Sequence, residues 1–150
     1  MCSGACELKS LPAISGEDGK LKITLRDLPV FQCEKKHNTP VHRDFMLWLI
    51  QEIRAREPQI PAGGEQGMIF KKHLCGACGK ELAAKPDRRH AYPYELRYED
   101  LAPFKLEVEL PLYNCPGCGK EQIRSVKELR AHMPAAIVAI NDAAGFPHSG

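Results

Sequence analysis

The sequence has no apolar run approaching the roughly 20 residues that a membrane-spanning helix needs. Its first residues also lack the basic stretch and apolar core that are typical of a secretory signal. These two absences predict a soluble protein that is not exported and resides in the cytoplasm. The formal net charge of +2 over 150 residues is too small to indicate nucleic-acid binding on its own, so such a role would need a local basic patch.

The familiar catalytic motifs are absent as well. There is no H-E-x-x-H pair of zinc ligands, no glycine-rich phosphate loop and no G-x-S-x-G nucleophile elbow. The six histidines are scattered, and apart from His37 none has a neighbouring ligand at metal-binding spacing. We therefore expect a protein that is not an enzyme.

Cysteine, by contrast, is abundant, with seven residues. An odd number of cysteines without a secretion signal argues against a disulfide scaffold and for a reducing compartment. Two segments, CGACGK at 75–80 and CPGCGK at 115–120, are nearly identical, and we call them the first and second knuckle. A C-x2-C turn directs two sulfurs at one ion, and the glycine that follows permits positive φ.

Four thiolates form the closed tetrahedral shell of a structural zinc site, which leaves no coordination position for a substrate. The sequence thus predicts one zinc ion bound by the cysteines of both knuckles, Cys75, Cys78, Cys115 and Cys118. The second knuckle also resembles that of a rubredoxin, which implies iron and electron transfer as a less favoured alternative. A colourless, zinc-loaded protein would argue against that alternative.

The chain contains an internal repeat. LKITLRDLPVFQC at 21–33 aligns with FKLEVELPLYNC at 104–115 when Asp27 is taken as one extra residue. Both copies alternate apolar and polar side chains, as a half-buried strand does, before Leu-Pro and an aromatic lead to cysteine. The repeat predicts a duplicated module in which a strand delivers the second half of each metal site.

If the copies are equivalent, the first also needs four ligands. Cys2 and Cys6 are separated by three residues, as are Cys33 and His37, and a Cys3His site from these four would give every cysteine a ligand role. His42 competes with His37 as the fourth ligand. The x3 spacing is less usual than x2, so a degenerate knuckle without metal is the alternative to a second zinc ion.

Helical signals follow each copy. The first helix is expected from Pro40 to Arg56, with Thr39 as its cap and Pro58 as its stop. In the second copy a capping box begins a helix at Ser125, and the Met133-Pro134 step is expected to interrupt that helix. A second helical segment is expected over 135–144, and Gly145 ends it.

The fold class expected from these features is α+β, small and stapled by metal. Two tandem zinc-ribbon-like β-hairpin modules are each followed by a helix. The modules span residues 1–57 and 69–150, and the breaker-rich stretch 58–68 is the predicted linker between them.

The first helix contains FMLWLI at 45–50, which is apolar on nearly every side. One interpretation is a protein-partner or homodimer interface formed by Phe45, Trp48 and Leu49, because aromatic anchors are common in interface hot spots. The other is a core helix between the two modules. Periodicity alone does not separate the two.

Basic residues surround the first knuckle, and residues 71–90 carry a local charge of +4. Lys71, Lys72, Arg88 and Arg89 are therefore candidate phosphate contacts for an alternative, nucleic-acid-binding function associated with transcription. The competing interpretation is a solvated loop whose charge is balanced by the acidic residues of 95–109.

The two knuckles and the Leu-Pro-x-aromatic-x-Cys approach resemble the YgiT-type zinc-finger family, known also from the zinc domain of MqsA-like antitoxins. The resemblance covers about 74–121 and, more loosely, 2–37. It implies that Cys75, Cys78, Cys115 and Cys118 hold a structural zinc, which shapes a surface for binding a partner protein. The chain differs from the antitoxins in its second ribbon-like segment and in having no evident helix-turn-helix, so DNA binding of that kind is not expected.

The function expected first is that of a non-enzymatic zinc protein that binds a protein partner, as an adaptor, antitoxin-like or regulatory protein.

Overall fold

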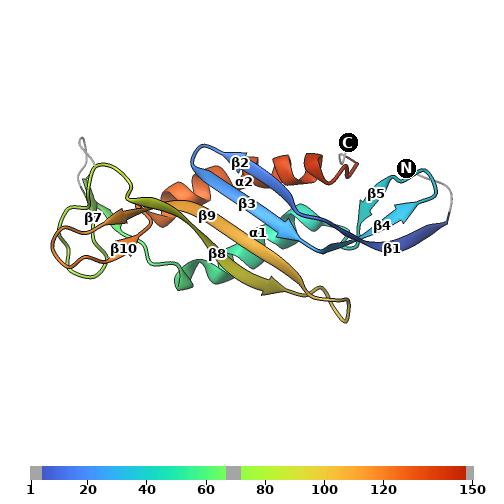
Figure 1. The fold of residues 1–150 in the computed structure, drawn as a ribbon, viewed down its shortest axis with the longest axis horizontal. Coiled ribbons are helices and arrows are strands. Elements are labelled where there is room, and N and C mark those ends of the chain that lie inside the picture. The colour runs from blue at the N-terminus through green and yellow to red at the C-terminus, as the bar shows by residue number, and fades with distance from the viewer. Residues whose placement is uncertain (1–4, 67–71, 148–150) are drawn as a thin grey trace.

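The computed structural model describes residues 5–66 and 72–147. It is a small mixed α+β structure with mostly antiparallel strands and, in the described residues, two α-helices (Figure 1). The elements in chain order are β1 (Cys6–Leu11), β2 (Ile14–Asp18), β3 (Leu21–Arg26), β4 (Leu28–Cys33), β5 (Asn38–Pro40), α1 (Phe45–Arg56), the 3-10 turn η1 (Glu57–Gln59), β6 (Gly64–Gln66), β7 (Lys72–Leu74), β8 (Arg88–Leu96), β9 (Phe104–Asn114), β10 (Glu121–Gln122) and α2 (Val126–Ala143). No helix in the described part of the chain combines the length and apolar character needed to cross a membrane.

The two repeat strands pair with each other. β3 and β9 are antiparallel neighbours in the largest sheet, whose order is β10-β9-β3-β2, with β8 also paired to β9. Thr24 lies opposite Glu107, and these two residues are also equivalent in the repeat alignment. The pairing therefore has a local two-fold relation centred on Thr24 and Glu107.

The halves 1–57 and 69–150 thus contribute neighbouring strands to one sheet. They also share one apolar core, which includes Ile23 and Leu49 from the first half and Leu106 and Ile137 from the second. The described part of the predicted linker, residues 58–66, does not divide this core, since Ile60 belongs to it. Within this stretch, Ala62 forms a bridge with Ile123, and β6 pairs with β7.

Asp27, the extra residue of the first copy, ends the similarity between the copies. Its φ of 62° is left-handed, which a short polar side chain tolerates. The chain breaks there into β3 and β4, and β4 joins a separate sheet with β1 and β5. The second copy has no such residue, so β9 continues without a break as far as the second knuckle.

Both helices cover one face of the large sheet and run in opposite directions (Figure 1). α2 packs closely on β2 because of Gly16, where an added Cβ would collide with the carbonyl of Ala136. α1 buries Phe45, Leu49 and Ile53 in the shared core. In the second copy the sequence alternation predicted the strand correctly: in β9 Phe104, Leu106 and Val108 are buried, and the residues between them are less so.

Two expectations about the helices are corrected. α1 begins at Phe45 rather than Pro40, because residues 38–40 pair with β4 as β5. α2 is continuous across Pro134 instead of restarting there. Buried side chains on both sides of the proline, among them Met133 and Ile137, hold one helix face on the sheet, and this burial outweighs the roughly 3 kcal/mol cost of an internal proline.

Both ends of α2 agree with the sequence. The Ser125 hydroxyl accepts a hydrogen bond from the Glu128 backbone N–H at 3.2 Å, which is the predicted cap. Gly145 follows the helix with a φ of 72°.

Candidate metal centre

The four cysteines of the two knuckles converge. The sulfurs of Cys75, Cys78, Cys115 and Cys118 all lie within 4.8 Å of one another. The Cys75–Cys118 separation is 3.7 Å and the Cys78–Cys115 separation is 3.3 Å. A tetrahedral zinc ion with Zn–S bonds of about 2.3 Å needs sulfurs about 3.8 Å apart, so the quartet can hold a metal ion after small adjustments.

The backbone builds both knuckles in the same way. The Cys75 N–H donates to the Lys80 carbonyl at 2.7 Å, and the Cys115 N–H donates to the Lys120 carbonyl at 3.1 Å. Gly79 has a φ of 81° and Gly119 a φ of 79°, in the left-handed region where glycine is favoured. The predicted role of the two glycines is confirmed.

Hydrogen bonds and neighbouring thiols shift the pKa values of thiols within the quartet in opposite directions. The pKa of the Cys75 thiol is lowered to about 5, chiefly because the Cys78 backbone N–H donates to its sulfur, with Gln122 contributing next. The pKa of Cys115 is also lowered, first by a backbone N–H of its own knuckle. The Lys80 N–H lowers the pKa of Cys78, but neighbouring thiols, Cys115 first, and burial together raise it to about 11. Four thiols so close become fully ionised only with a cation among them, as a zinc ion would provide.

Gln122 holds the first knuckle in place. Its side chain is 1% exposed; the amide oxygen accepts from the Gly76 N–H at 2.8 Å, and the amide nitrogen donates to the Cys75 sulfur at 3.2 Å. Such groups behind the ligands orient them and tune the metal. No sequence pattern predicted this role, because it depends on β10 lying beside the first knuckle.

We expect Gln122→Ala to weaken zinc binding about 10–100-fold without removing a ligand. The substitution leaves the Gly76 N–H and the Cys75 sulfur without their amide partner. Chelator competition with the purified protein measures the affinity, and the exposed Gln51→Ala on α1 is the matched control. Equal zinc affinities for the two variants would contradict a role for Gln122 at the metal centre.

Comparison with known proteins gives no match: no family model fits the chain, and no curated protein and no solved structure matches it.

The first copy does not bring a comparable set of ligands together in the described residues. Cys2 lies outside those residues. Cys6 and Cys33 are opposite each other in β1 and β4. The ligand atoms of Cys6, Cys33 and His37 do not all lie within 4.8 Å of one another, as the four sulfurs of the quartet do. The described residues show no second metal site.

The turn after Cys33 explains this difference. The Cys33 N–H donates to the His37 carbonyl at 3.1 Å, and Lys36 adopts a φ of 64°. This turn is one residue shorter than a knuckle, and His37 takes the position of Lys120 rather than that of Cys118. The competing ligand His42 instead accepts from the Asp44 N–H at 2.9 Å and stacks on Trp48.

The interface predicted on the first helix is corrected for two of its three residues. Phe45 and Leu49 are 4% and 0% exposed, so they belong to the core and leave almost no surface for a partner. Trp48 is half-buried and contacts Tyr98 and Phe104. The alternative interpretation, a core helix, describes these positions, because α1 lies over the sheet that both halves form.

Two of the four candidate phosphate contacts are engaged in ion pairs. Arg88 pairs with Glu121 at 3.0 Å, and Arg89 pairs with Glu109 at 2.9 Å. Lys72 is exposed, and Lys71 lies outside the described residues. Carboxylates on β9 and β10 therefore pair with two of the basic side chains that the sequence places near the first knuckle.

Proposed function

We propose that this chain is a non-enzymatic, cytoplasmic zinc protein in which one zinc ion on Cys75, Cys78, Cys115 and Cys118 maintains a surface that binds a protein partner. The observation that carries the proposal is the convergent thiol quartet. Four thiolates fill the coordination shell of zinc, so the ion supplies fold and offers no open position for catalysis.

The need for metal follows from the small apolar cluster at the knuckles. That cluster consists of Cys75, Leu82, Tyr113 and Cys115, and two of its members are ligands. So few apolar side chains cannot order two loops without a cross-link, and a metal is a common solution in small structures. The resemblance to YgiT-type zinc fingers, with their structural zinc and protein partners, supports the same function.

The ribbon of β1 and β4 provides exposed apolar surface for a protein partner. Leu8 and Phe31 lie opposite each other in the register and are 49% and 40% exposed. The ribbon lies at the opposite end of the molecule from β7 and β10, which flank the knuckles (Figure 1). A partner bound there would leave the zinc centre uncovered.

We expect a double substitution, Leu8→Ser with Phe31→Ser, to abolish partner binding while the zinc content stays unchanged. Affinity purification from the native cell, followed by reconstitution with the purified partner, measures this. Glu7→Ala, on the same strand, is the control. The proposal fails if the wild-type chain co-purifies with no protein in stoichiometric amount. It also fails if the double variant binds the same partner as strongly as the wild type does. Salt-sensitive binding to DNA or RNA in place of a protein would favour the nucleic-acid alternative.

A further inference from the structure

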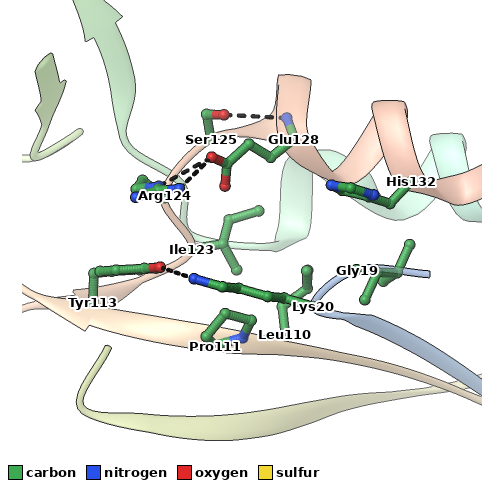
Figure 2. Close-up of a pocket in the computed structure, with 11 residues that line it drawn as sticks. Gly19, Lys20, Leu110, Pro111, Tyr113, Ile123, Arg124, Ser125, Glu128 and His132 are labelled. Carbon is green, nitrogen blue, oxygen red and sulfur yellow. Dashed lines mark hydrogen bonds and ion pairs between the residues drawn. The ribbon is translucent and has the colours of Figure 1, made fainter. Parts of the chain in front are cut away.

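A cavity of about 280 Å³, whose lining includes none of the four metal ligands, lies between the β2–β3 turn, β9 and the start of α2 (Figure 2). Leu110, Pro111 and Ile123 provide its apolar surface. Lys20 and Tyr113 contribute polar groups that meet inside it. The cavity therefore combines an apolar wall with a defined polar end.

The cavity exists because one edge of β9 is incompletely covered. β3 pairs with β9 as far as Glu109, and β10 pairs with it only from Tyr113 onward. The Leu112 carbonyl accepts from the Asp87 N–H on the β8 side. Backbone groups alternate along a strand, so Pro111 directs its backbone toward the gap, where a proline leaves no N–H unpaired.

The polar end of the cavity has a cation that is not neutralised. The Lys20 ammonium donates to the Tyr113 hydroxyl at 3.3 Å, and no ion pair with a carboxylate is found for it among the described residues. The other basic groups of the lining are paired: Arg124 with Glu128 at 2.7 Å, and His132 with Asp18 at 2.8 Å. Lys20 is thus the cation available to a ligand.

The Tyr113 hydroxyl adds a second donor. It accepts the Lys20 hydrogen bond, which leaves its own hydrogen to donate, and the side chain is 1% exposed. Figure 2 shows the Lys20 side chain reaching this hydroxyl below Ile123. The remaining ammonium hydrogens and the phenol hydrogen form a pair of donors with charge assistance, suited to a carboxylate.

We propose that this cavity binds a small organic carboxylate. The carboxylate accepts hydrogen bonds from Lys20 and Tyr113, and the apolar body of the ligand packs on Leu110, Pro111 and Ile123. The volume lies near the lower end of the roughly 300–1,000 Å³ typical of ligand pockets, which fits a single ring or a short chain. A single unpaired cation beside an apolar wall suits this class better than it suits inorganic phosphate.

NMR titration of the zinc-loaded full chain with benzoate and hexanoate tests the proposal. We expect saturable binding, with amide shifts at Lys20, Tyr113 and Ile123, and about tenfold weaker binding of neutral benzamide, because charge-assisted hydrogen bonds are lost. Equal affinity for benzamide would overturn the proposal. So would phosphate binding without benzoate binding, or no saturable binding of either carboxylate.

Substitutions locate the site. Lys20 is exposed at a turn, so the Lys20→Gln variant should fold normally. Its affinity for benzoate should be at least about tenfold lower than that of the wild type. Lys22→Gln, on the same hairpin but outside the cavity lining, should bind like wild type. Tyr113→Phe keeps the ring and should weaken binding severalfold. A folded Lys20→Gln protein with unchanged benzoate affinity would disprove the assignment.

Discussion

Replacing Cys118 with serine is expected to release zinc from the protein and to unfold the knuckle end of the chain. Cys118 is exposed, so the change removes a metal ligand with little loss of apolar packing. Apparent zinc-binding free energies of about 10–16 kcal/mol in zinc-finger peptides show how much folding can depend on such an ion. Elemental analysis gives the zinc content per chain, and circular dichroism reports the structure.

Cys6→Ser is the matched control, because Cys6 lies on β1 in the other repeat. If the chain has one metal centre, the Cys6→Ser variant keeps its zinc content and its circular dichroism spectrum. If Cys2, Cys6, Cys33 and His37 also bind an ion, wild type contains two zinc ions and Cys6→Ser loses one. Unchanged zinc and an intact spectrum for Cys118→Ser would contradict the quartet as a structural site. A coloured, iron-loaded wild type would favour the rubredoxin-like alternative.

The convergence of the four cysteines could be predicted from the sequence because its information is local. Each C-x2-C-G segment encodes its own turn, and the close similarity of the two turns indicated a shared ion. Gln122 could not be found in this way. Its role depends on where β10 lies relative to the first knuckle, and a buried glutamine has no characteristic spacing.

The strands of the repeat could also be predicted, but not their pairing. Alternation shows which face of a strand is buried and says nothing about which strand lies beside it. The sequence therefore suggested two tandem ribbons, whereas β3 and β9 are neighbours. The effect of Asp27 was equally hidden: one extra residue, in a left-handed conformation, separates β3 from β4 and sends β4 to another sheet.

Replacing Leu49 with alanine is expected to destabilise both halves of the chain together by about 3 kcal/mol, within the range of buried Leu→Ala changes. Leu49 is 0% exposed and belongs to the core cluster that residues of both halves form. A cavity at this position removes contacts from the single core instead of from one module. Urea unfolding can be followed by Trp48 fluorescence for the first half and by zinc release for the second.

Leu47→Ala separates the contribution of burial from that of helix propensity. Leu47 is on the same helix but is 55% exposed, so its truncation should change the free energy of unfolding by no more than about 0.5 kcal/mol. For Leu49→Ala, the fluorescence and zinc-release midpoints should fall together, because a shared core makes unfolding cooperative. A shift of the Trp48 signal alone would show that the halves unfold independently, as tandem modules would. A loss of stability that depends on protein concentration would instead indicate that Leu49 stabilises a dimer.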